Sequence, residues 1–231
     1  MSILLFSKRR EDFYFQKAYD FIKLNCEDVV LVQGLPGEPF PREYLSWEGD
    51  YILSYLCPWV LPAEILQKAK KAAINFHPGP PQYPGTGCTN FALYHEVDVY
   101  GVTCHHMASH VDTGNIIAVK RFPVFPSDTV YSLTQRCYSH MLALFYDIFS
   151  YIVMDAPLPV TDEVWTREPY RRKDLNALKR IELDMPPDEI RRRIRASAFP
   201  GTPGAYVEIA GERFEHTQNK IRKENLPEGA G

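Results

Sequence analysis

Apolar and polar positions follow two different spacings along the first half of the chain. Short apolar runs, typical of buried strands, are separated by segments in which apolar residues recur every three or four positions, as on one face of a helix. Strands that alternate with helices usually pair in parallel. The pattern therefore predicts an α/β fold with a Rossmann-like, mostly parallel sheet and flanking helices. The predicted strands are 2–6, 29–32, 51–55 and 72–76, and the predicted helices are 11–24 and 62–71.

A break in the helical spacing divides the chain in two. Ser127 and Asp128 provide a cap and an acidic first turn for a long helix that runs to about Met154, and prolines then interrupt the pattern. We therefore predict a main domain over 1–157 and a small α+β extension over 158–231 that ends in a β-hairpin. The other expected elements are helices at 89–96, 174–181 and 186–199, strands at 100–109 and 116–122, and hairpin strands at 206–209 and 213–216.

Composition narrows the class of protein. The chain has 231 residues, of which 45% are apolar and 24% charged, so it can bury a substantial core. Long uncharged apolar runs and a signal-peptide pattern are absent from the sequence, and the five cysteines are scattered. This favours a soluble, cytoplasmic protein with reduced thiols and no membrane partner. The net charge of −3 counts against a nucleic-acid partner, because proteins that grip a long polyphosphate usually carry a basic excess.

Two polar side chains mark the end of the strand predicted at 72–76. Asn75 and His77 leave a strand on the same face, because side chains alternate with a period of two. Open α/β sheets bind ligands at this end of their strands. An amide and an imidazole can stabilise an oxyanion and relay a proton, and Asp112 is the carboxylate that would orient the imidazole. No serine or cysteine adjoins the pair, so the attacking group is expected to belong to a substrate. The alternative is that both residues only cap a loop.

Three separated blocks of sequence resemble one enzyme family. The motif N-x-H-P at 75–78, a Pro/Gly loop, and D-x-G-x-I at 112–116 resemble the signature of the folate-dependent formyltransferases. The loop HPGPPQYPGTG at 77–87 and the block FPGTPGAY at 199–206 resemble the sugar N-formyltransferases. They are less similar to the relatives that act on methionyl-tRNA or glycinamide ribonucleotide. The resemblance covers most of the chain from about residue 50, and it implies the formyltransferase fold, with the catalytic domain over 1–157.

The resemblance also implies an activity. A formyl group would pass from 10-formyltetrahydrofolate to the primary amine of a nucleotide-linked amino-deoxy sugar. The expected nucleotide is dTDP, and the expected pathway makes a surface polysaccharide such as the O-antigen of lipopolysaccharide. Asn75, His77 and Asp112 would be the catalytic set, with His77 largely neutral near pH 7 so that it accepts a proton from the amine. Family habit and the exposed edges of a hairpin imply a homodimer.

Three other activities stay open at this stage. The same catalytic set could hydrolyse formyltetrahydrofolate with water, although relatives of that kind usually carry a regulatory domain before the first strand, and this chain begins directly with a strand. Another small amine, such as glycinamide ribonucleotide, could be the acceptor. A binding module without catalysis is the third alternative, and the presence of the full catalytic set counts against it.

The resemblance and the position of the loops predict two groups of ligand contacts. The loop after the third strand could be ordinary packing around Trp59, and the segment from Tyr170 to Lys173 could be a solvated charged face instead of a diphosphate site. Tyr83 could stack on a sugar or base or merely cover its loop, and Asn90 could contact the acceptor or only start a helix. The expected donor contacts are Cys57, Trp59, Leu61, His106, His110, Val111 and Asp112. The expected acceptor contacts are Gly79, Pro80, Tyr83, Asn90, Tyr170, Arg171, Arg172 and Lys173.

Three histidines raise the question of a metal. His105, His106 and His110 lie within six positions, and three imidazoles can bind zinc. On a strand, His105 and His106 point to opposite faces, which is unsuitable for a shared ion. We therefore expect no metal, with His106 in or beside the pocket and His105 packed or at the surface.

Overall fold

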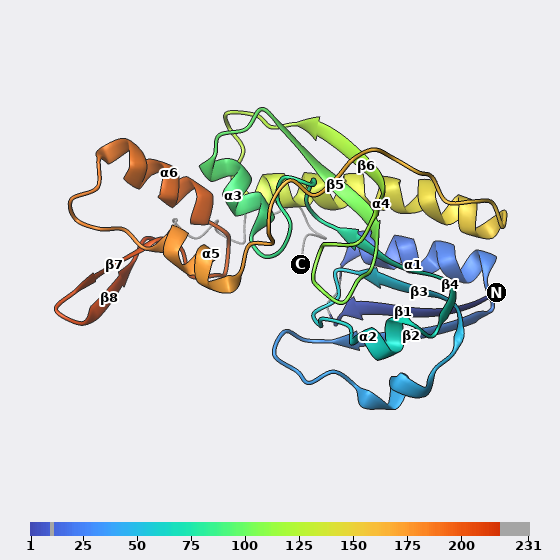
Figure 1. The fold of residues 1–231 in the computed structure, drawn as a ribbon. Helices are drawn as coiled ribbons and strands as arrows, with labels where there is room; N and C mark the ends of the chain where they lie inside the picture. Colours follow the sequence, from blue (N-terminus) through green and yellow to red (C-terminus); the bar gives the residue numbers. More distant parts are fainter. Residues whose placement is uncertain (10–11, 218–231) are drawn as a thin grey trace.

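A six-stranded sheet in the order β2-β1-β3-β4-β5-β6 forms the centre of the protein (Figure 1). The structure is a computed structural model that describes residues 1–9 and 12–217. The pairs β1·β2, β1·β3 and β3·β4 are parallel, whereas β5 runs antiparallel to β4 and β6 antiparallel to β5. The predicted α/β fold with a mostly parallel sheet is confirmed. The strands are β1 (Ser2–Lys8), β2 (Asp28–Gly34), β3 (Gly49–Tyr55), β4 (Ala69–His77), β5 (Val99–His106) and β6 (Ile116–Pro123).

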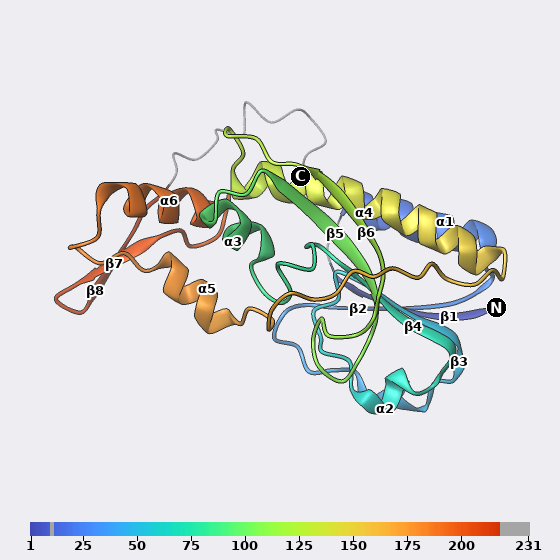
Figure 2. The same cartoon turned by 45° about the horizontal axis from the view of Figure 1, so that its top comes forward.

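Helices cover both faces of this sheet (Figure 2). The helices α1 (Phe13–Asn25) and α4 (Val130–Val153) pack side by side on one face, over Leu5 and Leu53. On the other face, the short α2 (Ala63–Leu66) and the 3-10 helix η1 (Arg42–Ser46) cover the neighbouring strand positions, Leu4 and Ile52 among them. The alternation of side chains along each strand therefore produces two apolar clusters, one on each face.

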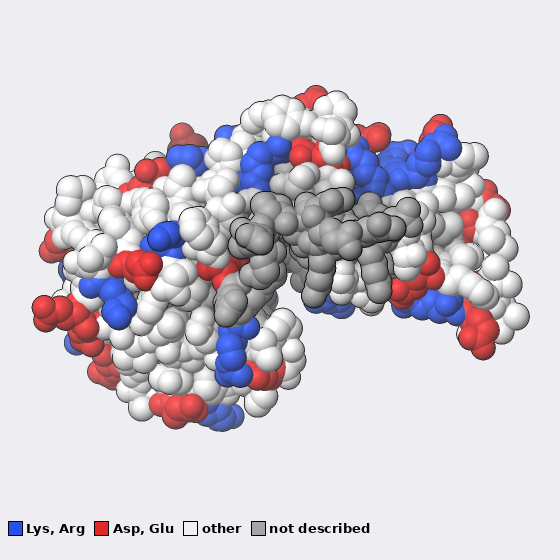
Figure 3. All heavy atoms as spheres, turned by 180° about the vertical axis from the view of Figure 1, so that it is seen from behind, with Lys and Arg blue, Asp and Glu red and all other residues white. Residues whose placement is uncertain are grey.

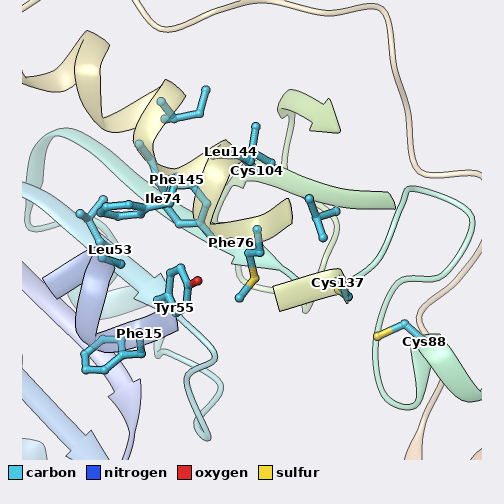
Figure 4. Packing of buried hydrophobic residues seen from close by; sticks show 14 of the residues in the cluster. Phe15, Leu53, Tyr55, Ile74, Phe76, Cys88, Cys104, Cys137, Leu144 and Phe145 are labelled. Atoms are coloured by element: carbon cyan, nitrogen blue, oxygen red, sulfur yellow. The ribbon is translucent and has the colours of Figure 1, made fainter. Parts of the chain in front are cut away.

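Aromatic packing fixes the two strands that lead to the polar residues. The Phe145 ring of α4 is fully buried, and its centroid lies 5.8 Å from that of Tyr55 on β3 and 5.1 Å from that of Phe76 on β4 (Figure 4). Burying aromatic rings of this size is a dominant stabilising contribution in a core. Because Tyr55 and Phe76 adjoin Ser54, Asn75 and His77 in the sequence, this packing also holds the ends of both strands in place.

The C-terminal part lies beyond one end of the sheet (Figure 1). Helix α6 (Pro187–Ser197) packs on α3 (Cys88–Tyr94), and the Nδ2 of Asn90 donates to the carbonyl of Ala196 over 2.7 Å. The predicted hairpin is confirmed as β7 (Tyr206–Ile209) and β8 (Glu212–Glu215), which projects away from the rest. The remaining helix is α5 (Arg172–Lys179). The last part of the extension predicted at 158–231 lies outside the described residues.

Two predicted elements differ in detail. Helix α4 is capped by Thr129, because the Oγ1 of Thr129 accepts from the backbone N–H of Ser132 and the Oγ of Ser132 accepts in return from that of Thr129. Asp128 instead accepts from the Phe125 N–H and pairs with Arg136. The helix predicted at 62–71 is only four residues long, because pairing of β4 with β3 already begins at Ala69.

The surface mixes charges of both signs. Seen from behind, basic and acidic side chains are interspersed with uncharged surface over the described residues (Figure 3). Within the ranges that the structure describes, every helix is too short or too polar to cross a lipid bilayer.

Candidate active site

The polar residues of the site come from the ends of three adjacent strands and from one loop. Asn75 and His77 end β4, and Ser54 is the register partner of Asn75 on β3. On the other side, His105 of β5 is the antiparallel partner of Asn75. Asp112 lies in the loop between β5 and β6 and reaches back to this edge. The sheet register alone therefore brings an amide, two imidazoles and a hydroxyl together.

Two neighbours hold the Asn75 amide in one orientation. Its Oδ1 accepts from the Oγ of Ser54 over 2.6 Å, and its Nδ2 lies 3.0 Å from the Nε2 of His105. His105 is 2% exposed, and its Nδ1 donates to the carbonyl of His106 over 2.8 Å. An amide NH₂ carries two hydrogens, and the contact with His105 uses one of them. The other remains for a ligand at the edge of the sheet.

The His77 imidazole is enclosed between two hydrogen-bond acceptors. Its Nδ1 lies 3.2 Å from the Oδ2 of Asp112, and its Nε2 lies 2.9 Å from the carbonyl oxygen of Tyr83. An imidazole donates from both nitrogens only when it is protonated. Burial by itself lowers the pKa of His77, and the Asp112 carboxylate, together with Cys88 and the Tyr83 carbonyl, more than offsets this, so that the pKa is raised. The two acceptors and the raised pKa both favour a charged imidazole near pH 7, where the sequence analysis expects a neutral one.

Asp112 is held on both of its oxygens. Its Oδ2 accepts from the backbone N–H of Gly85 over 2.7 Å as well as facing His77, and its Oδ1 lies 3.3 Å from the Nε2 of His105. Burial by itself raises the pKa of Asp112, but the charge of His77 and the hydrogen bond from the N–H of Gly85 lower it overall. Asp112 also adopts a left-handed backbone conformation, with a φ of 47°, which Asp tolerates better than most residues.

The glycine of the D-x-G motif has a packing reason. A Cβ added to Gly114 would lie 1.8 Å from the carbonyl oxygen of His106, well inside van der Waals contact. Only glycine allows the loop after Asp112 to pass this close to the end of β5. The close approach keeps the loop that contains Asp112 against the end of β5.

A cavity of about 420 Å³ adjoins this group of residues. Asn75, His77, His105 and Asp112 form its polar end, while Trp59 and other apolar side chains form much of the remaining wall. The Trp59 ring also packs edge-on against Phe6, at a centroid distance of 6.3 Å. The expected donor contacts that line the cavity are Cys57, Trp59, Leu61, His110, Val111 and Asp112, and Asn75 and His77 of the expected catalytic set line it as well. His105 is buried and lines the cavity, whereas its neighbour His106 is outside this lining.

The expected acceptor residues lie elsewhere. Tyr83 and Tyr170 are buried and stack on one another at 6.4 Å, and the faces of the Tyr170 ring meet Phe91 and the guanidinium of Arg167. The ring of Tyr170 is thus occupied by the protein itself. Asn90 bonds to the backbone of α6. Gly79 and Pro80 are buried, and Arg171, Arg172 and Lys173 are exposed at the start of α5.

Sequence reasoning missed three residues of this site: Ser54, His105 and Trp165. The centroid of the Trp165 ring lies 5.0 Å from that of His105 and 5.8 Å from that of His77. For His105 a signal was present, because Val102 and Cys104 are apolar and point to the core, which leaves Thr103 and His105 on the face of His77. In the part of the chain that the structure describes, no group of three or more His, Cys, Asp or Glu side chains could hold a metal ion.

Comparison with protein families gives a match over 38–146, which includes Asn75, His77 and Asp112, to the family described as formyl transferase. Residues 38–146 therefore resemble a formyl transferase domain. A methionyl-tRNA formyltransferase of Latilactobacillus sakei is 26% identical over 205 residues, which are 88% of this chain and 63% of that protein. A GDP-perosamine N-formyltransferase of Brucella melitensis is 27% identical over 77% of this chain and 68% of the relative. The chain thus spans roughly two thirds of these relatives.

Solved structures share the fold of most of this chain. A sugar N-formyltransferase from Shewanella superposes with a TM-score of 0.77 at 17% identity, covering 95% of this chain and 98% of the other. An N-formyltransferase from Helicobacter canadensis, in complex with folinic acid and dTDP-3-aminofucose, superposes with a TM-score of 0.69 at 19% identity over 85% of this chain and 80% of the other. At these identities the likeness shows the fold alone, and it confirms the predicted formyltransferase fold.

The raised pKa of His77 predicts a pH-dependent part of the stability. The pKa in the folded protein, about 9, lies above the unfolded value of 6.5, so charge on His77 stabilises the fold fully below pH 6.5 and this contribution is lost as the pH rises to about 9. We expect the free energy of unfolding, from urea titrations, to fall more steeply over this window in the wild type than in His77→Gln. The exposed His216 supplies a matched control, His216→Gln. Equal slopes in the wild type and His77→Gln would contradict the charge assignment.

Proposed function

We propose that this site transfers a formyl group from 10-formyltetrahydrofolate to the primary amine of a nucleotide-linked amino-deoxy sugar. The observation that carries the proposal is the buried His77–Asp112 pair beside the Asn75 amide, at the polar end of a cavity. Such a group can stabilise negative charge on an oxygen, because it supplies a fixed cation and an amide N–H. The match of 38–146 to the formyl transferase family supports this reaction class.

The cavity suits the folate donor. Trp59 and Leu61 offer apolar wall for a flat ring, and the loops that contain Cys57 and Val111 bring backbone groups to it. When bound, the folate supplies a formyl group on a nitrogen that becomes a leaving group. The Helicobacter relative is in complex with folinic acid, which supports a folate as the donor.

Three residues would do the chemistry. The free N–H of Asn75 and the charged His77 stabilise the negative charge that develops on the formyl oxygen as the amine nitrogen bonds to the formyl carbon. Asp112 accepts the proton that the amine nitrogen loses, and the same proton passes to the departing nitrogen as the bond between it and the formyl carbon breaks. The roles differ from the sequence expectation, since His77 begins as a cation and Asp112 is the proton acceptor.

The acceptor would bind beside the cavity. Arg171, Arg172 and Lys173 are exposed and can pair with a diphosphate, and dTDP is our proposed nucleotide because the Helicobacter relative is in complex with a dTDP-amino sugar. The net charge of −3 and the mixed charges of the surface in Figure 3 favour such a small acceptor over tRNA. We further propose a cytoplasmic homodimer that acts in the synthesis of a surface polysaccharide such as an O-antigen.

An acceptor panel tests the proposal. The protein is incubated with 10-formyltetrahydrofolate and with dTDP-, UDP- and GDP-linked amino sugars, glycinamide ribonucleotide or methionyl-tRNA, and the formylated product is identified by mass spectrometry. We expect turnover with at least one amino sugar, and fastest with a dTDP-linked one. Formate release in the absence of any amine would identify a hydrolase instead, and turnover with glycinamide ribonucleotide or methionyl-tRNA alone would also refute the sugar assignment.

Loss of the Asn75 amide should affect turnover and spare binding. Asn75→Ala removes one donor to the developing oxyanion, and such a loss lowers kcat by roughly 10²–10³-fold. We expect the KM values for the formyl donor and the amine acceptor to stay within about threefold, because the Asn75 N–H acts chiefly in the transition state. Asn25→Ala, on an exposed position of α1, is the matched control and should retain wild-type kcat. A kcat of Asn75→Ala within twofold of the wild type would sink the proposed role.

A further inference from the structure

The connection between α4 and α5 runs back across the molecule (Figures 1 and 2), and its Trp165 lies close to His77 and His105. We call residues 163–170 of this connection the strap. The Oε2 of Glu163 accepts from the Nη2 of Arg121 on β6 over 2.9 Å, and the N–H of Thr166 donates to the carbonyl of Pro81 over 3.2 Å. The strap lies outside the segment 38–146 that matches the formyl transferase family.

Trp165 is the strap residue that reaches the charged group. Its Nε1 donates to the carbonyl of Gly114 over 2.8 Å, which ties it to the glycine of the D-x-G motif. Its ring stands nearly perpendicular to the imidazoles of His77 and His105, with interplanar angles of 76° and 88°. The indole is half-buried, and the two imidazoles that it contacts are only 4% and 2% exposed.

The other end of the strap supports Asp112. The N–H of Tyr170 donates to the carbonyl of Pro84 over 2.9 Å, and the carbonyl of Tyr170 accepts from the N–H of Thr86 over 2.8 Å. These two bonds hold Gly85, whose own N–H donates to Asp112. A Cβ on Gly85 would lie 2.2 Å from the Tyr170 oxygen, and the φ of Gly85 is +87°, so this close pairing requires glycine.

We propose that Trp165 is a positioning residue, which holds His77 and His105 against Asp112 and keeps water away from the three. An ion pair is attracted more strongly where water is excluded, because the effective dielectric constant is lower. Removing the indole would let water reach the pair and would free the loop at Gly114. The strap would thus complete a charged group whose other members belong to the formyl transferase domain. The kinetic consequence rests on the proposed function, whereas the structural one does not.

The structural consequence is measured by NMR on the free protein. Imidazole N–H protons that are buried and hydrogen-bonded exchange slowly with water, and those of His77 can be assigned by their loss in His77→Gln. We expect them to exchange at least tenfold faster in Trp165→Ala than in the wild type. Trp165→Phe keeps a ring but loses the donor to Gly114, and it should lie between the two. Trp47 is half-buried at the opposite end of β3, and Trp47→Phe is the control that should match the wild type.

The kinetic consequence follows in the assay that the acceptor panel selects. We expect kcat of Trp165→Ala to fall by roughly 10- to 100-fold, with both KM values within about threefold and with partial recovery in Trp165→Phe. The proposal is overturned if the His77 N–H exchange rate or kcat of Trp165→Ala is within twofold of the wild-type value. If the alanine variant does not fold, the same limits apply to Trp165→Phe. It is also overturned if the wild type shows no slowly exchanging N–H. Because the exchange measurement uses no substrate, it gives its answer even if no amino sugar is formylated.

Discussion

The buried ion pair between His77 and Asp112 is the interaction on which the arrangement of this site depends. Each charge would be expensive to bury alone, and the partner of each lies about 3 Å away. The surroundings complete the pair, since the Tyr83 carbonyl accepts from the other imidazole nitrogen and the Gly85 N–H donates to the carboxylate. The loops at these strand ends thus hold a cation and an anion in place at the end of a cavity.

The charge of the pair determines what the site can do. A neutral His77 would take a proton from an incoming amine, whereas a charged His77 presents positive charge before any substrate arrives. Such a site needs little reorganisation when negative charge develops on an oxygen. Asn75 fits the same scheme, because Ser54 and His105 fix the orientation of its amide and one N–H remains for a ligand. We therefore see the site as built to stabilise an oxyanion, with proton transfer through Asp112.

The sequence predicted much of the fold, because strand and helix spacing are local properties of the chain. Asn75 and His77 share a face for the same reason, and the D-x-G motif identified Asp112. The prediction failed where the answer depended on contacts between distant segments. Alternation places His105 and His106 on opposite faces, but which face meets the cavity depends on pairing with β4. The stacking of Tyr170 on Phe91 and the position of Trp165 depend on the path of the connection after α4, which has no periodic signal. Tyr170 was an expected acceptor contact, and its ring packs against Phe91 within the protein.

The account requires both ring nitrogens of His77 to carry protons at neutral pH. The direct measurement is ¹⁵N NMR of the histidine ring nitrogens in the free protein, with His77 assigned by comparison with His77→Gln. We predict that Nδ1 and Nε2 both have the shifts of protonated nitrogens at pH 7 and that deprotonation begins only above the usual range of histidine. A spectrum in which one His77 nitrogen is unprotonated at pH 7 would contradict the account.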